Sequence, residues 1–253
     1  MVSLAEKMAA NLDMSAFGKA EELKKRLWFT ILALIVFRLG TFIPLPGIDP
    51  KILAEIFARN SGGILGMFNM FAGGALERMT IFALNIMPYI SASIIIQLGQ
   101  SVIPSLQALK KEGEAGHRKV TQYTRYLTVL ITIIQGYGIA VGLEGMTGSA
   151  GLSAVIAPGF VFRFTTIVSL VGGTMFIVWL GEQITARGVG NGSSLIITVG
   201  IIANIPTALA QTFELGRVGS MSAPVILMLL AMVLGLILSL IHISEPTRHA
   251  QIS

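Results

Sequence analysis

Six long apolar stretches alternate with polar segments along the chain. They cover residues 27–43, 80–103, 127–143, 164–180 and 194–213, and a sixth begins after Pro224. A helix that spans a bilayer needs about 17–25 mostly apolar residues. The pattern therefore predicts an all-α fold, a polytopic bundle of membrane helices, preceded by a polar segment at residues 1–26.

A seventh apolar patch, residues 64–75, is too short to span a bilayer. Gly66, Asn69, Gly73 and Gly74 interrupt it. A short apolar segment beside a long one is typical of a re-entrant or broken helix that lines a cavity. An amphipathic loop outside the membrane would give the same pattern, so both interpretations stay open.

Composition agrees with a membrane protein. Hydrophobic residues make up 53% of the 253 positions, charged residues only 12%, and the mean hydropathy is +0.77. A soluble domain carries about 25% charged residues, and a disordered chain combines low hydrophobicity with high charge. The sequence has no cysteine, which excludes disulfides, thiolate nucleophiles and cysteine metal sites.

Basic residues gather in segments that would share one side of the membrane. They lie before the first span, after the fourth, and after the second, where they are Lys110, Lys111, Arg118 and Lys119. Because loops rich in lysine and arginine stay in the cytoplasm, the N-terminus is predicted to be cytoplasmic. Binding of anionic lipid or RNA is an alternative interpretation of this basic loop, but topology accounts for most of the charge.

No constellation of side chains predicts catalysis. The run 188–193 superficially resembles a phosphate loop, but residue 193 is serine where that motif needs glycine, and no strand precedes it. A tight turn into a helix, capped by Ser193 or Ser194, is the favoured interpretation. Ser149 has no plausible histidine base. The sequence therefore predicts no enzyme, no metal and no cofactor.

The apolar stretches carry almost no ionisable side chain at mid-membrane, where an ion-coupled carrier would need one. The isoleucines of the second and fifth stretches could form a hydrophobic constriction or could simply pack against lipid and neighbouring helices. They are Ile86, Ile90, Ile94, Ile95, Ile96, Ile196 and Ile197. The glycines of Gly138-x-x-x-Gly142 predict a close helix contact.

Three longer motifs go beyond composition. They are Ile81-Phe-Ala-Leu-Asn-Ile-Met-Pro-Tyr-Ile-Ser-Ala-Ser-Ile-Ile-Ile-Gln-Leu98, Lys110-Lys-Glu-Gly-Glu-Ala-Gly-His-Arg-Lys119, and Trp179-Leu-Gly-Glu-Gln-Ile-Thr-Ala-Arg-Gly-Val-Gly-Asn-Gly192. Together they resemble the SecY family, the central channel subunits of the bacterial protein translocase. The resemblance runs from about Lys24 to Leu236, in the order and with the spacing of that family.

The resemblance implies roles for particular positions. It implies a pore-closing plug at 62–78, with Ile64, Met67, Phe68, Asn69, Met70, Phe71, Gly73 and Gly74 as its residues. It implies an apolar pore ring at Ile86, Ile90, Ser193 and Ile197, and a lateral gate that includes Ser91 and Gln135. Two positions depart from the family pattern, because Ser193 stands where isoleucine is usual and Asn85 where glycine is usual.

The family resemblance also implies a function and a set of partners. The complete protein would conduct unfolded polypeptides through or into the bacterial inner membrane. It would do so with SecE and SecG subunits, a SecA motor ATPase or the ribosome, signal-sequence-bearing polypeptides and surrounding lipid, and without direct nucleic-acid binding. A solute transporter and an intramembrane enzyme are the alternatives, but the stretches offer no clear midplane site or nucleophile for either.

The resemblance covers only the first part of a ten-span fold. Residues 27–213 correspond to a five-span half, and 214–237 to the start of a sixth span. From about Leu238 the run Leu238-Ser-Leu-Ile-His-Ile-Ser-Glu-Pro-Thr-Arg248 resembles an in-frame translation of a transposase-type sequencing adapter. Residues 238–253 are therefore predicted to be a non-native tail.

Overall fold

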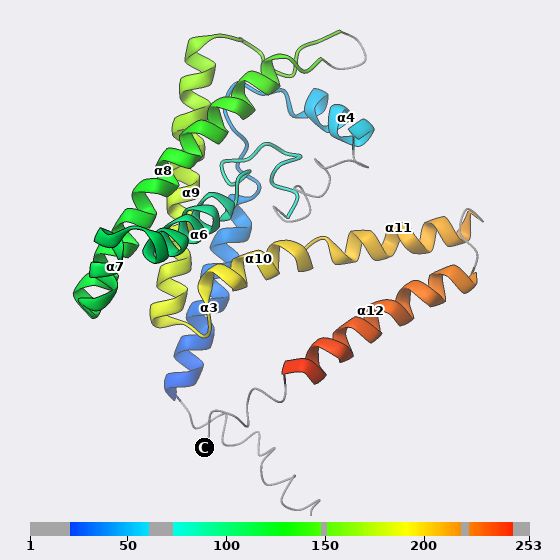
Figure 1. Ribbon diagram of the computed structural model, residues 1–253. Coiled ribbons are helices and arrows are strands. Elements are labelled where there is room, and N and C mark those ends of the chain that lie inside the picture. Colours follow the sequence, from blue (N-terminus) through cyan, green and yellow to red (C-terminus); the bar gives the residue numbers. More distant parts are fainter. Residues whose placement is uncertain (1–20, 61–72, 148–150, 219–222, 245–253) are drawn as a thin grey trace, which may run out of the picture. The chain divides into compact units, whose positions relative to one another are not determined.

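The chain folds as helices joined by turns. The computed structural model describes residues 21–60, 73–147, 151–218 and 223–244, and the all-α prediction is confirmed there. The helices so described, shown in Figure 1, are α3 (Glu21–Gly40), α4 (Pro50–Asn60), α6 (Met87–Val102), α7 (Pro104–Lys111), α8 (Glu114–Glu144), α9 (Phe160–Arg187), α10 (Gly192–Ile202), α11 (Ile205–Arg217) and α12 (Ala223–Ser244). The chain divides into two compact units, Met1–Ala203 and Asn204–Ser253.

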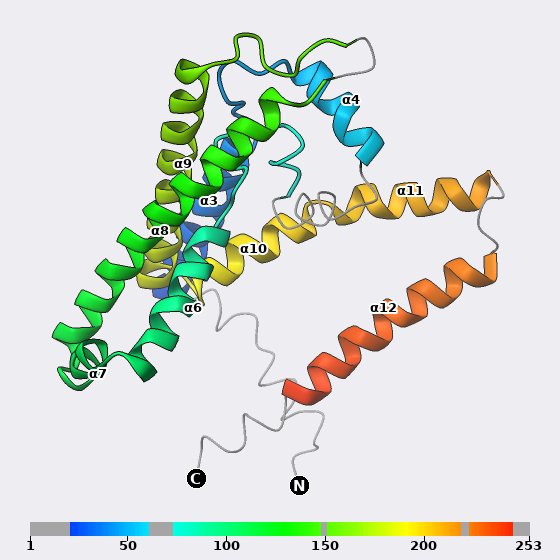
Figure 2. The same ribbon diagram turned by 45° about the horizontal axis from the view of Figure 1, so that its top comes forward.

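Helices α8 and α9 form the main pair of the first unit and lie side by side in both views (Figures 1 and 2). Small or hydroxyl-bearing residues four positions apart line the buried face of α8, namely Thr124, Thr128, Thr132, Gly136 and Ala140. The buried hydroxyls of Thr128 and Thr132 each donate to the carbonyl four residues earlier, at 2.7 Å. Because these hydroxyls are satisfied within α8, they add no unpaired polar group to the interface.

Ion pairs join α8 to α9 near both ends. The guanidinium of Arg125 donates to both carboxylate oxygens of Glu182, at 3.0 and 2.6 Å. At the opposite end Arg163 donates to Glu144 at 2.6 Å, and the same carboxylate accepts the N–H of Gly159, just before α9, at 2.8 Å. These two ion pairs therefore tie α8 to α9 near both ends.

A glycine-rich turn connects α9 to α10 and closes against α3. The N–H of Val189 donates to the hydroxyl of Thr30 on α3 at 3.0 Å. The predicted turn is confirmed, but the predicted cap is wrong: Asn191 caps α10 and its side chain accepts the N–H of Ser194 at 3.1 Å. Asparagine caps helices as well as serine does, so the sequence is equally compatible with a cap at Asn191.

The predicted second span, 80–103, is wrong as a single helix. Thr80 forms an isolated bridge with Pro44, residues 81–86 form turns, and α6 begins only at Met87. Ile103 breaks the helix before Pro104. Helix α7 then leaves at 95° to α6. Proline cannot donate the N–H that a continuous helix needs at this point, so the chain ends one helix and starts another.

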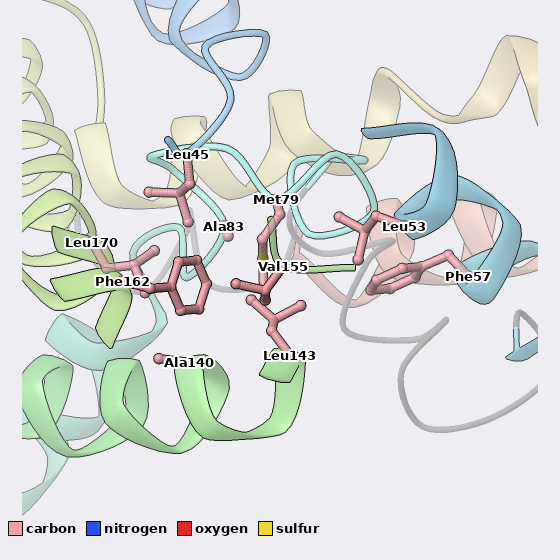
Figure 3. Close-up of a cluster of buried hydrophobic side chains, with 10 residues drawn as sticks. All are labelled: Leu45, Leu53, Phe57, Met79, Ala83, Ala140, Leu143, Val155, Phe162 and Leu170. Carbon is pink, nitrogen blue, oxygen red and sulfur yellow. The ribbon is translucent and has the colours of Figure 1, made fainter. Parts of the chain in front are cut away.

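Loops and helix ends enclose a first apolar cluster, drawn in Figure 3. Helix α4 contributes Leu53 and Phe57, and the facing ends of α8 and α9 contribute Leu143 and Phe162. The remaining members of this first cluster are Leu45, Met79, Ala83, Ala140, Val155 and Leu170. Helix α4 thus covers the turns that precede α6.

The second unit contains α11 and α12, which contact each other. The predicted fifth span, 194–213, is interrupted by a turn at 203–204, with Pro206 in the first turn of α11. Helix α12 continues through Ser244 and so extends into the stretch predicted to be a non-native tail. That stretch stays a prediction, and residues 245–253 lie outside the described residues.

Three described stretches are long and apolar enough to cross a membrane: Glu114–Glu144, Phe160–Arg187 and Gly192–Arg217. The bent pair α6 and α7 would make a fourth. The predicted number of six spans is therefore not reached in the part of the chain that the structure describes. Helix α3 carries charge in its first turns, and the apolar run Leu227–Leu236 in α12 is short, so the first and sixth spans stay predictions.

Candidate functional site

A turn-rich segment, residues 73–86, leads into α6 and carries the first predicted ring residue. The stretch that follows α3 holds its backbone by two hydrogen bonds. The N–H of Leu45 donates to the carbonyl oxygen of Met79 at 2.9 Å, and the N–H of Ile81 donates to the carbonyl oxygen of Ile43 at 3.1 Å. Met79 and Asn85 have positive φ angles of 43° and 50°. These left-handed residues cannot belong to a right-handed helix, which explains why an apolar run here is not helical.

The aromatic ring of Phe82 anchors this segment between two helices. It stacks on Phe37 of α3 at 6.0 Å and on Phe176 of α9 at 5.9 Å between ring centroids. A Cβ atom built on Gly40 would overlap the Phe82 ring, so only glycine leaves room for it. The segment is therefore wedged between α3 and α9.

Four elements meet in a second apolar cluster. Ala33 and Phe37 come from α3, Phe82 and Ile86 from the segment 73–86, Ile177, Val178, Leu180 and Ile184 from α9, and Ile196 from α10. Ile86 and Ile196 are fully buried, whereas Ile90 and Ile197 pack against the cluster and stay partly exposed. The second cluster thus has a sealed interior and an apolar edge.

A cavity of about 430 Å³ lies between α6, α8 and the segment 73–86. Its lining is mainly apolar and includes the amide side chains of Asn85 and Gln135. Gly138 and Gly142 also line it, and a Cβ atom on either would have no described atom within 4 Å. Among the described residues, these two glycines therefore border open space and make no close helix contact.

Comparison with known proteins identifies the family. The family model for SecY matches residues 80–253. The chain belongs to the SecY family. The protein translocase subunit SecY of Escherichia coli K12 is 55% identical over 234 residues, covering 92% of this chain and 52% of that protein. SecY of Buchnera aphidicola is 55% identical and SecY of Rickettsia conorii is 57% identical, covering 92% and 79% of this chain and 65% and 46% of those proteins.

The chain spans about half the length of the E. coli relative that it matches. Among solved structures it is similar to one titled "The structure of a protein conducting channel", with a TM-score of 0.48, 18% identity, and coverage of 77% of this chain and 38% of that one. It is also similar to a SecY structure in which the plug domain is said to stabilise the closed state, with a TM-score of 0.49 and 19% identity.

Within this SecY-family chain, the structure gathers three of the four predicted ring residues at the second cluster: Ile86, Ile90 and Ile197. Ser193 lies one turn before Ile197 on α10 and is partly buried beside Gly181 of α9, where an added Cβ would be 3.6 Å from the Ser193 hydroxyl oxygen. The burial of Ile86 is complete, so its side chain exposes no surface in this conformation. The role of these residues in a pore stays a prediction.

The other predicted site residues lie in three places. Gln135 lines the cavity, and Ser91 lies partly buried on the neighbouring helix α6. The basic loop residues Lys110, Lys111, Arg118 and Lys119 are all exposed around the turn from α7 to α8. Of the plug residues, Gly73 and Gly74 are buried, and Ile64, Met67, Phe68, Asn69, Met70 and Phe71 lie outside the described residues.

The left-handed backbone of Asn85 accounts for the residue type at this position. Asparagine adopts that conformation more readily than other side-chain-bearing residues, whereas glycine adopts it without cost. Asn85→Gly and Asn85→Ala both remove the side-chain amide, so the difference between their free energies of unfolding reports the cost of the left-handed backbone. We expect the free energy of unfolding of the alanine variant to be about 1 kcal/mol lower than that of the glycine variant. Equal unfolding free energies, measured by denaturant titration in detergent, would contradict a strained backbone.

Two features of the site were missed at the sequence level. Arg38 is a lone charge within the apolar stretch 27–43, and its guanidinium reaches the carbonyl of Gly73. Gly173 was not noted at all, although a Cβ atom there would overlap the carbonyl oxygen of Ile81. A lone arginine or glycine within an apolar helix was the available signal, but neither says which distant backbone it contacts.

Proposed function

We propose that this chain forms the first half of a protein-conducting channel subunit, which moves unfolded polypeptides across or into a membrane. The observation that carries the proposal is the convergence of Ile86, Ile90 and Ile197 on one apolar cluster. Ile197 lies more than a hundred residues after Ile86 and Ile90 in the chain. The family assignment rests on the sequence comparisons and not on this cluster. In this proposal the complete protein is a conduit for polypeptides and performs no catalysis.

An apolar seal suits such a conduit on physical grounds. A pore that passes many sequences cannot depend on specific hydrogen bonds to its cargo. Aliphatic side chains can adapt around varied chains, and a hydrophobic constriction excludes water and ions when it is empty. In the proposed ring, Ile90 and Ile197 present the apolar edge and the buried Ile86 supports them from behind. Ser193 would make its sector of the ring more polar.

The distribution of charge supports an orientation and a set of partners. The exposed basic turn between α7 and α8 would lie in the cytoplasm with the N-terminus, because positively charged loops stay on that side. We propose the bacterial inner membrane as the location. SecE and SecG would pack beside the chain, SecA or the ribosome would deliver the signal-bearing polypeptide, and Ser91 and Gln135 would border its lateral exit to lipid.

Complementation tests this function. The chain is co-expressed with the part of E. coli SecY that lies beyond the matched region, in E. coli depleted of its own SecY. We expect export of a signal-bearing precursor to resume, because the two pieces together supply the length of the relatives. A precursor that lacks its signal sequence is the control and should stay in the cytoplasm.

Two results would contradict the proposal. One is failure of export although both pieces accumulate in the membrane. The other is saturable uptake of a small solute by the reconstituted protein without any polypeptide, which would favour the solute-transporter alternative. Transport of that kind needs a polar midplane site.

A further inference from the structure

Arg38 occupies an unusual position for a charged residue. It lies in the last turn of α3, within the apolar stretch 27–43, and is only partly exposed. Its Nη1 donates to the carbonyl oxygen of Gly73 at 2.9 Å, and its guanidinium carbon lies 5.4 Å from the centre of the Phe42 ring. A charged side chain in an apolar helix is costly and usually has a specific partner. Among the described residues, the hydrogen-bond partner of this guanidinium is the backbone carbonyl of Gly73.

Gly73 is held tightly where Arg38 meets it. The residue is buried and has φ +64°, a conformation that favours glycine. A Cβ atom on Gly73 would lie 3.1 Å from the backbone of Gly200 on α10 and 3.2 Å from Nη1 of Arg38. Gly73 therefore fits between α3 and α10 with no room for a side chain.

Gly73 is also the first described residue of the segment that ends at Ile86. Phe82 anchors the far part of this segment between α3 and α9, and the Thr80–Pro44 bridge holds its middle. Among the described residues, the hydrogen bond from the side chain of Arg38 holds its start. The position of Ile86 in the second cluster thus depends on contacts at both ends of one short segment.

We propose that Arg38 is a positioning residue of the apolar seal: by holding the Gly73 carbonyl between α3 and α10, it fixes the segment that places Ile86 in the second cluster. The consequence for the seal rests on the proposed channel function. The positioning itself does not, because it concerns the geometry of residues 73–86 alone.

Arg78 provides a matched control. Its guanidinium lies 4.5 Å from the centre of the same Phe42 ring, so it shares the charge and the ring contact of Arg38. Among the contacts of the described residues, the bond to Gly73 belongs to Arg38 and not to Arg78. Arg38→Gln and Arg78→Gln therefore remove the same charge near the same ring, and only the first removes that bond.

The absence of native cysteine permits a direct test. Ala75 is fully buried two residues after Gly73, and Ala92 is fully buried on α6. In the whole chain in membranes, each is changed singly to cysteine and its rate of labelling by a maleimide is measured. We expect Arg38→Gln to speed labelling of Ala75→Cys about tenfold, as loss of one charge-assisted hydrogen bond would allow. Arg78→Gln should leave that rate unchanged, and Arg38→Lys should give an intermediate rate.

Three results would overturn the proposal. Labelling of Ala75→Cys that is insensitive to Arg38→Gln would show that the bond does not fix the segment. Equal acceleration by Arg78→Gln would assign the effect to charge or to the Phe42 ring. Faster labelling of Ala92→Cys in Arg38→Gln would show general loosening of the fold. Because labelling does not require translocation, these results are separate from failure of the export test.

Discussion

Replacing Gly173 with alanine is expected to lower the free energy of unfolding of the first unit by about 3 kcal/mol, the upper part of the usual cost of overpacking. The added Cβ would overlap the carbonyl oxygen of Ile81 and lie 2.8 Å from its carbonyl carbon. Both are backbone atoms in a segment held by Ile43 and by the stacked ring of Phe82, so they cannot move aside alone. Denaturant titration in detergent would measure the change.

Gly172 is the matched control for this variant. It is the preceding residue of α9 and is exposed, and a Cβ atom there would have no described atom within 4 Å. Gly172→Ala should therefore stabilise the helix, by roughly 0.5–1 kcal/mol, because alanine favours helix more than glycine does. Similar effects of the two changes would contradict the close contact between α9 and the segment 73–86.

Asparagine at the apolar seal is expected to raise the resting ion leak of the complete channel. Ile90→Asn should raise the resting conductance about tenfold, because an amide at the apolar edge loses roughly 1–3 kcal/mol in a dry constriction and hydrates it instead. Ile86→Asn should leak as well, but it would also destabilise the fold, since Ile86 is fully buried. Ile90→Asn is therefore the cleaner variant for recording in planar bilayers.

Ile94 supplies the comparison for the leak measurement. It lies one turn further along α6 and is 51% exposed, outside the second cluster. Ile94→Asn introduces the same side chain on the same helix and should leave the resting conductance unchanged. Equal conductance of Ile90→Asn and the unchanged protein would remove Ile90 from the ring.

The apolar pattern located the long helices well and their boundaries poorly. The stretches 127–143 and 164–180 lie within α8 and α9, but each helix extends further through charged or polar ends. Hydropathy detects only the apolar part, whereas backbone hydrogen bonding continues beyond it. The stretch 80–103 is not one helix for another reason. Residues 81–84 are apolar because they are buried or partly buried, and their conformation is set by Thr80, Asn85 and the neighbouring chain.

The family motifs group residues that share one cluster, although their role in a pore stays a prediction, and they give no sign of where distant backbones meet. Ile86, Ile90 and Ile197 were expected together and lie together. The spacing of Gly138 and Gly142 predicted packing, but these glycines border a cavity, whereas Gly173 and Gly192 make the close contacts. Spacing along one helix gives no information about which partner passes it, so such contacts appear only in the three-dimensional structure.

The bond between Val189 and Thr30 spans 159 residues of chain, and this has a consequence for biosynthesis. A ribosome adds about 5–20 residues per second, so Val189 follows Thr30 after roughly 8–30 s. Helices α8 and α9 are neighbours in sequence and can pair as soon as both have been made. Helix α3 is made earlier than either, and its residue Phe37 can stack on Phe82 soon after both have been made. Thr30, in contrast, receives the N–H of Val189 only after the end of α9. The part of α3 around Thr30 is therefore enclosed later than the part around Phe37, although it is made first.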